Sequence, residues 1–334
     1  MNWTGIQKAL EKEPTYRVNQ VKKALFQDFA QSWEAVTVLP KALREKLQNE
    51  YPLDIFAQTY ISQKDKTVKV LITMSDGNQV ESVLMRHKGG RNTVCVSSLV
   101  GCPMGCTFCA TAGMGMVRAL TQDEILLQVL FFARMLKNES ARVGSVVFMG
   151  MGEPFLNYEA VLGAVHLLND PGMFGIGARH ISISTCGILE GIARLAREKI
   201  PVNLAVSLHG SNDEVRSTLM PIARTYTIAE LMRVVDEYIE KTKRKVMFEY
   251  LLVRGVNDAP EHARELGELL RGKRCMVNLI SYNPTGRYTA TSEKNSNRFK
   301  TILTKGGVEA SIRYRFGRDI EGACGQLVTK QQDV

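Results

Sequence analysis

Residues 93–113 read TVCVSSLVGCPMGCTFCATAG, a short apolar run followed directly by a loop that contains three cysteines. Five more apolar runs of similar length follow it along the chain. All six are nearly continuously apolar, as expected of strands that are covered on both faces. The six runs are TVCVSS, GSVVFMG, HISISTCG, VNLAVSLH, VMFEYLL and MVNLIS. We therefore predict six parallel strands, the first of which leads into the cysteine loop.

Helical stretches separate these runs, and two of them carry clear start signals. Thr121 with Glu124 forms a capping box before ILLQVLFFARML, and Thr227 with Glu230 does the same before LMRVVDEYI. This alternation predicts an α/β fold, a partial (β/α)6 barrel over residues 92–330. Because functional groups gather at the carboxyl ends of the strands in such folds, we expect the site in four loops there: GMGEP, STCG, SLHG and SYNP.

Two further segments precede the predicted barrel. Residues 1–65 read as helical and basic, and they carry a stripe of apolar residues at helical spacing that we expect to be core: Leu25, Phe26, Phe29 and Trp33. Residues 66–91 contain two β-rich runs around Asp76-Gly77 and are predicted to form a hairpin. The chain thus divides into a small helical accessory domain, a β-hairpin connector and the barrel.

Composition narrows the classes of protein to consider. The 334-residue chain is 45% hydrophobic, contains no run of eighteen apolar residues and begins without a signal-peptide pattern, so we expect a cytoplasmic protein that does not enter a membrane. Its seven cysteines, three of them clustered, indicate metal or redox chemistry in a reducing compartment. A net charge of +9 favours a polyanionic partner such as nucleic acid, although it would also serve solubility alone.

The cysteine loop holds Cys102, Cys106 and Cys109 at a C-x3-C-x2-C spacing. A structural zinc ion takes four ligands, so a remote residue would have to complete a zinc site. Three thiolates also suit a 4Fe–4S cluster, where they leave one iron open to a small molecule. The residues alone leave both possibilities open.

This spacing, with Phe108 before the last cysteine, resembles the signature of the radical S-adenosylmethionine (SAM) enzymes. In that superfamily the open iron of a 4Fe–4S cluster binds the amino and carboxylate groups of SAM, and an electron from the cluster breaks a carbon–sulfur bond. GMGEP, residues 150–154, resembles the superfamily's GGEP loop. The resemblance implies that Gly152 and Glu153 contact the methionyl part of SAM.

Several further segments resemble the RlmN/Cfr family of RNA adenosine methyltransferases: FMGMGEPFLN, ISIST, VSLHGSNDEVRSTLMPI, GVNDAPEHA, VNLISYNP and DIEGACGQL. The match runs from about Glu81 to Leu327 and extends more weakly to the N-terminal helices, an RNA-binding accessory domain in this family. The implied substrates are 23S rRNA and, as an addition, tRNA. The resemblance also implies an external electron donor such as flavodoxin or ferredoxin, two SAM molecules per turnover and a monomer.

The resemblance assigns roles to individual residues. Cys324 matches the methyl-carrying cysteine, Cys95 the resolving cysteine, and Glu81 a carboxylate that accepts the proton lost from the substrate carbon. The remaining residues expected to line the SAM pocket are Ser184, Ser207, Leu208, His209 and Asn283. Without the resemblance, Cys95 would be a buried strand cysteine, Cys324 a loop thiol and Glu81 a solvent-facing hairpin residue. We expect Cys186 and Cys275 to be core residues.

The family methylates either carbon 2 or carbon 8 of adenosine. PFLN, residues 154–157, resembles the carbon-2 branch, RYRFGRDI leans toward the carbon-8 branch that confers antibiotic resistance, and STCG matches neither. We predict carbon 2. Two alternatives of other classes are a zinc-stabilised RNA-binding module without catalysis and a radical SAM enzyme acting on a small molecule.

Overall fold

The computed structural model describes residues 1–328, and its centre is a ten-stranded sheet of order β1-β2-β3-β4-β7-β8-β9-β10-β11-β12. From β4 onward every neighbouring pair is parallel. The parallel strands are β4 (Asn92–Cys95), β7 (Ser145–Phe148), β8 (Ile181–Thr185), β9 (Asn203–Ser207), β10 (Val246–Leu252), β11 (Cys275–Ser281) and β12 (Ala310–Ile312). The six predicted strands and the α/β fold are thus confirmed. The three-residue β12 is a seventh parallel strand that the sequence did not suggest.

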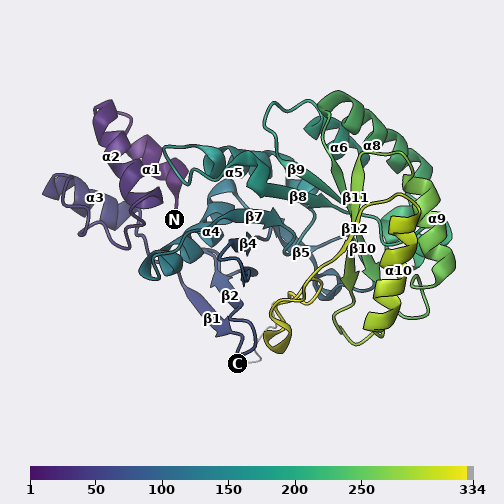
Figure 1. Ribbon diagram of the computed structural model, residues 1–334. Coiled ribbons are helices and arrows are strands. Elements are labelled where there is room, and N and C mark those ends of the chain that lie inside the picture. The colour runs from purple at the N-terminus through teal and green to yellow at the C-terminus, as the bar shows by residue number, and fades with distance from the viewer. Residues whose placement is uncertain (329–334) are drawn as a thin grey trace.

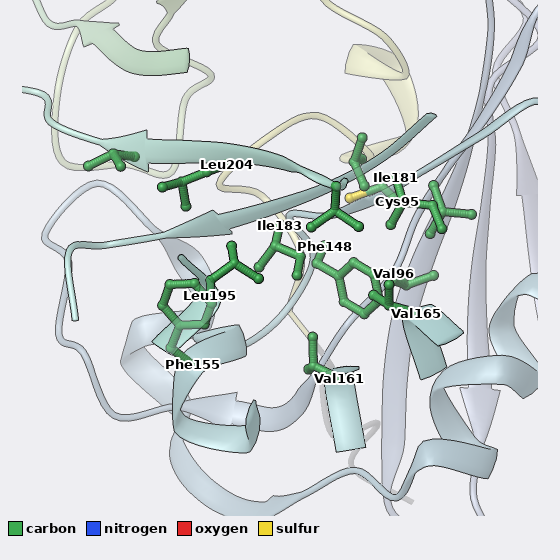
Figure 2. Packing of buried hydrophobic residues seen from close by; sticks show 14 of the residues in the cluster. Cys95, Val96, Phe148, Phe155, Val161, Val165, Ile181, Ile183, Leu195 and Leu204 are labelled. Atoms are coloured by element: carbon green, nitrogen blue, oxygen red, sulfur yellow. The ribbon is translucent and has the colours of Figure 1, made fainter. Parts of the chain in front are cut away.

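Helices cover the outer face of this curved sheet (Figure 1). They are α4 (Gln122–Asn138), α5 (Tyr158–Asn169), α6 (Leu189–Leu195), α7 (Asp213–Leu219), α8 (Ile228–Thr242), α9 (Pro260–Leu270) and α10 (Glu293–Lys305). Both predicted capping boxes are present, at the starts of α4 and α8. Figure 2 shows how the layers pack, with Val161 and Val165 of α5 facing Phe148 of β7. The loops that follow the carboxyl ends of the strands can hold a site.

The predicted hairpin is confirmed as β2 (Val68–Thr73) and β3 (Gln79–Arg86). It joins the main sheet because β3 pairs antiparallel with β4. The prediction that residues 1–65 are helical is wrong at its end, since Ala57–Ile61 form a strand, β1, that pairs with β2. All five residues of β1 are exposed or half-buried, so the strand lacks the apolar alternation by which sequence reveals strands. Backbone pairing with β2 forms it.

The N-terminal helices α1 (Trp3–Ala9), α2 (Thr15–Phe26) and α3 (Lys41–Glu50) group at one end of the molecule around their own apolar cluster (Figure 1). Leu25, Phe26 and Trp33 are buried there as predicted, whereas Phe29 is only half-buried. The indole N–H of Trp33 donates a hydrogen bond to the carbonyl of Tyr51 at 2.7 Å. Met173, from the segment after α5, belongs to the same cluster, so the small helical core packs directly against the barrel.

After β12 the chain crosses back to the opposite end of the sheet, toward β1 and β2 (Figure 1). The Ser62 hydroxyl donates to Asp319 at 2.7 Å, and the Gly317 N–H donates to Asp65 at 3.0 Å. This crossing segment, residues 313–328, therefore ties the last strand to the first hairpin. The predicted barrel boundary at residue 330 lies outside the described residues. Within residues 1–328, no helix is long and apolar enough to cross a membrane.

Candidate active site

The cysteine loop is held between two short antiparallel strands, β5 (Leu99–Cys102) and β6 (Gly115–Ala119). Their register shifts at Gly101, which adopts a φ of +75° and lies so close to the partner strand that a Cβ would be 1.9 Å from the Gly115 carbonyl oxygen. Only glycine fits this bulge. The bulge and the pairing fix where the loop leaves the sheet.

Neighbouring segments hold the cysteine loop from three sides. The Thr107 N–H donates to the carbonyl of Leu219 at the end of α7, at 2.9 Å. The Thr285 hydroxyl donates to the carbonyl of Phe108 at 3.1 Å. On the third side, the Ala110 N–H donates to the carbonyl of Gly325 at 2.8 Å, which joins this loop to the crossing segment.

The three loop cysteines line one cavity at the carboxyl ends of the strands, which we call the cluster cavity. The predicted residues that share its wall are Cys102, Cys106, Cys109, Gly152, Glu153, Ser184, Ser207 and His209. Two predicted residues are placed elsewhere. Leu208 points into the apolar core, and Asn283 lines a neighbouring cavity. Residues far apart in the sequence thus meet here because parallel strands end at the same edge.

The donor set fits an iron–sulfur cluster. All three cysteines are free thiols, and no disulfide competes for them. Among residues 1–328, no three His, Cys, Asp or Glu side chains gather as closely as one metal ion requires. Zinc–thiolate bonds of about 2.3 Å would demand such a gathering, whereas in a 4Fe–4S cube each cysteine binds a different iron.

Glu153 presents a carboxylate to this cavity from a rigid turn. Gly152 before it has a φ of +102°, and a Cβ there would lie 2.8 Å from the Leu99 nitrogen. The Glu153 carboxylate accepts the N–H of Cys186 at 2.7 Å and that of Phe155 at 3.1 Å. Burial raises the pKa of Glu153, although these bonds oppose the rise. A buried carboxylate of this kind is a suitable partner for a ligand's ammonium group.

His209 follows β9 in a left-handed conformation, with a φ of +55°. Its Nδ1 accepts the N–H of Leu251 at 3.0 Å, and its ring meets the Phe108 ring edge-on at 4.9 Å. Burial, with the nearby charge of Arg216, lowers the pKa of His209 to about 3. The imidazole is therefore neutral, and with Nδ1 accepting, Nε2–H is its remaining donor.

Cys95 and Cys324 line a second, smaller cavity, the thiol cavity, together with Val83, Met149 and Arg313. Both cysteines are free thiols. Burial raises the pKa of Cys95 to about 12. The Cys324 side chain is exposed to the cavities that it lines. Desolvation by the surrounding protein nevertheless raises the pKa of its thiol to about 11. Both sulfurs are therefore protonated at neutral pH, and the charge of Arg313 favours the thiolate of each.

Glu81 lies on β3 and is buried, so the alternative of a solvent-facing hairpin residue is wrong. Its carboxylate forms an ion pair with Lys69 at 2.8 Å and accepts the N–H of Val328 at 2.8 Å. Burial raises its pKa even so. The side chain thus contacts the crossing segment and lies outside the walls of the cavities described in this section.

A third cavity, of about 360 Å³, is strongly basic. Its wall carries Arg91, Arg179, Arg313 and Arg315, and no Asp or Glu is among the described residues that line it. Three rings line the same cavity, where Phe316 meets His87 at 5.0 Å and Tyr314 at 4.9 Å. We call it the basic cavity. Cys324 belongs to its wall as well as to those of the cluster and thiol cavities.

The sequence reasoning missed a charged pair at the centre of the barrel. Arg313 and Glu249 approach each other at 3.5 Å, and both line the cluster cavity. A signal for Glu249 was present, because a glutamate inside the apolar run VMFEYLL is costly unless it has a partner. Arg313 gives no such signal, because with Arg315 and Arg318 it forms a basic cluster of the kind that solvated surfaces also carry.

Fold and site together define a class of protein: a parallel α/β barrel with a three-cysteine loop after its first strand and an acidic glycine-rich loop after its second. In agreement, residues 96–267 match the model of the radical SAM superfamily, so the chain belongs to it. A crystal structure of a radical SAM methyltransferase from Sphaerobacter thermophilus superimposes with a TM-score of 0.93 at 43% identity, covering 96% of both chains.

Two curated relatives identify the family within this superfamily. The "probable dual-specificity RNA methyltransferase RlmN" of Symbiobacterium thermophilum is 45% identical over 96% of this chain and 87% of its own. The protein of the same name in a Staphylococcus aureus strain is 44% identical over 96% and 88%. The chain belongs to the RlmN family of radical SAM RNA methyltransferases, as the resemblance predicted. Membership decides against a zinc-stabilised module without catalysis.

Proposed function

We propose that this protein methylates carbon 2 of an adenosine in 23S rRNA, and of one in tRNA, with two SAM molecules consumed per turnover. One observation carries the proposal: Cys324 lies where the cluster cavity, the thiol cavity and the basic cavity meet. A group carried on its sulfur can be reached from the SAM side, the resolving thiol and the RNA side. An RNA-binding module would not need such a junction.

In this proposal Cys102, Cys106 and Cys109 hold a 4Fe–4S cluster, and Glu153 binds the ammonium group of SAM. When bound, the cluster supplies the electron that cleaves SAM to a 5′-deoxyadenosyl radical. Gly152, Ser184, Ser207 and His209 line the same cavity and orient SAM. The neutral His209 offers SAM a hydrogen-bond donor without adding a positive charge beside its sulfonium.

Cys324 and Cys95 act at different steps of the methyl transfer. Cys324 Sγ first takes a methyl group from one SAM, and this carbon, after loss of a hydrogen atom to the radical from a second SAM, bonds to the adenine. The resulting adduct carries an unpaired electron, which would return to the 4Fe–4S cluster as the ring proton leaves, so that a closed-shell thioether links Cys324 to the base. Glu81 is our candidate for accepting the proton displaced from the ring, once Val328 frees its carboxylate. Cys95, after giving up its thiol proton, then attacks Cys324 Sγ. A disulfide forms, the sulfur–carbon bond breaks, and the departing carbon takes up a proton to become the methyl group of the released base. An external reductant must reopen the disulfide before the next turnover.

The basic cavity supports RNA as the substrate. Four arginines without a carboxylate among them suit the phosphates that flank a flipped-out nucleotide, and aromatic rings such as Tyr314 can stack on bases. We further propose that the N-terminal helices, within residues 1–65, assist RNA binding. The barrel domain would then comprise residues 92–330, joined through the 66–91 hairpin. We also propose that an acidic flavodoxin or ferredoxin donates the electron. The protein is proposed to be a monomer in the cytoplasm.

Mass spectrometry of nucleosides from cells with and without this gene tests the proposal. We expect 2-methyladenosine to depend on the gene. An 8-methyladenosine dependence would instead assign the other target carbon, and unchanged RNA would favour a small-molecule substrate. In vitro, Cys324→Ala should abolish methylation, and Cys95→Ala should trap RNA covalently on the enzyme.

Cys275→Ala is the matched control for Cys95→Ala, because Cys275 is equally a buried cysteine but lies under α9, away from the three cavities. It should methylate RNA at the wild-type rate. A Cys95→Ala enzyme that turns over normally would refute the two-thiol scheme.

A further inference from the structure

Arg216 is a fully buried arginine on α7, directly behind the wall of the cluster cavity. Its guanidinium donates to the carbonyl of Cys186 at 2.7 Å and to that of Tyr226 at 3.2 Å. Its Nε–H, one of the five N–H donors of an arginine side chain, has no hydrogen-bond partner. The side chain makes no ion pair with any carboxylate of the described chain, and two neutral carbonyls are its whole set of partners.

A buried guanidinium without an anion is expensive, since the desolvation penalty is several kcal/mol per ion. Proteins retain such groups when an anion balances them. Burial indeed lowers the pKa of Arg216, and the negatively ionising groups that oppose this are Cys186, Asp213 and Cys106. Asp213 forms no ion pair with Arg216, because its carboxylate accepts the Ile228 N–H instead. No carboxylate of the described residues therefore balances the charge of this guanidinium.

The surroundings place Arg216 beside the cysteine loop. Its guanidinium donates to the carbonyl of Cys186, a residue that lines the cluster cavity together with the three loop cysteines. The helix that carries it, α7, ends at Leu219, whose carbonyl accepts the Thr107 N–H within the cysteine loop. The helix is also fixed tightly against SLHG, because a Cβ at Gly210 would lie 2.5 Å from the Arg216 nitrogen. The backbone of Arg216 is thus held close to SLHG, and its side chain is fully buried.

We propose that Arg216 is the buried counter-charge of the iron–sulfur cluster, a positioning residue that raises the cluster's reduction potential. A cluster held by three thiolates is anionic, and it becomes more so when it accepts an electron. A fixed cation nearby in a medium of low dielectric stabilises the reduced form more than the oxidised form. This inference rests on the proposed function, because it requires that the three cysteines hold a cluster.

The test is the midpoint potential of the reconstituted, full-length enzyme, followed by electron paramagnetic resonance. Arg216→Met should make reduction at least tenfold less favourable, which is about 59 mV more negative for a one-electron couple. Arg216→Lys keeps the charge while losing the paired hydrogen bonds, and its potential should stay near that of the wild type. Iron and sulfide content is measured for every variant.

Arg134 provides the matched control. It likewise donates to two backbone carbonyls, of Leu53 at 2.8 Å and Ala30 at 2.5 Å, and its Nε–H is also without a partner. It lies against the N-terminal helices, away from the cysteine loop. Arg134→Met should lower the melting temperature and leave the midpoint potential unchanged.

The possible results distinguish a failure of this inference from a failure of the proposed function. Equal potentials in wild type, Arg216→Met and Arg216→Lys, all with full cluster content, would overturn the inference and leave the proposed function standing. If Arg216→Met folds by circular dichroism but loses the cluster that Arg216→Lys keeps, the missing charge is again the cause. If Arg216→Lys loses it equally, the role is structural and the inference fails. Wild-type protein without iron and sulfide would refute the proposed function itself.

Discussion

The buried His209 should make the free energy of unfolding depend on pH. Its imidazole is buried, its Nδ1 is occupied by the Leu251 N–H, and its pKa is lowered to about 3. In the unfolded chain the pKa of a histidine is about 6.5. Below that pH the unfolded state therefore binds a proton that the folded state refuses, so the free energy of unfolding falls as the pH falls.

The magnitude follows from the linkage between the two pKa values. Each pH unit below about 6.5 costs about 1.4 kcal/mol until the folded pKa is approached. Between about pH 7.5 and pH 5 the loss attributable to His209 is about 2 kcal/mol. This stability is fully present above the unfolded pKa and is lost toward pH 3, which is the behaviour of a group whose folded pKa is depressed.

Urea denaturation of the cluster-free protein at a series of pH values measures this loss. His209→Asn is the informative variant, because asparagine tolerates the left-handed backbone at this position and does not titrate. Its stability should fall less between pH 7.5 and pH 5 than that of the wild type, by about 2 kcal/mol. His180→Asn is the control at an exposed histidine and should retain the wild-type slope. Parallel pH profiles for wild type and His209→Asn would refute the reasoning.

Two further predictions concern the hairpin and the glycine-rich loop. Lys69→Met leaves the Glu81 carboxylate buried without its counter-charge. It should lower the free energy of unfolding, measured by urea denaturation at neutral pH, by about 3–5 kcal/mol. The double variant with Glu81→Gln should recover most of that stability, and no recovery would contradict the ion-pair account. Gly152→Ala combines a φ of +102° with a Cβ placed 2.7–2.8 Å from Leu99, so it should abolish SAM binding in equilibrium dialysis. Gly77→Ala, at a φ of +82° with no atom within 4 Å, is the matched control for strain alone and should bind SAM normally.

The features that sequence predicted well are those fixed by local pattern or by parallel topology. Six apolar runs became six strands, and Thr121 and Thr227 form the expected capping boxes. Because parallel strands end at one edge, the loops GMGEP, STCG and SLHG were certain to lie together once the alternation was recognised. Glu153 and Ser184 share a cavity with the cysteine loop for that reason.

The features that sequence could not predict depend on partners brought from far away. Arg216 sits in a segment that reads as an ordinary polar helix, and only the packing of α7 against SLHG buries it. Strand β1 exists through pairing with β2, without an apolar face of its own. Glu81 looked like a surface residue of a hairpin until Lys69 and Val328 were seen to cover it.

The placement of Cys324 shows how the fold serves the proposed chemistry. Cys95 ends β4, near one end of the parallel sheet, whereas Cys324 follows β12 at the other end, so only the crossing segment can bring the two sulfurs to one cavity. Three hydrogen bonds hold the backbone around Cys324 by its own carbonyls: Asn283 donates to that of Cys324, Ala110 to that of Gly325 and Thr111 to that of Leu327. The loop is therefore fixed while the Cys324 side chain stays exposed to all three cavities. A carrier that must be methylated, bonded to a base and then attacked by a second thiol requires this separation between a held backbone and an unengaged sulfur.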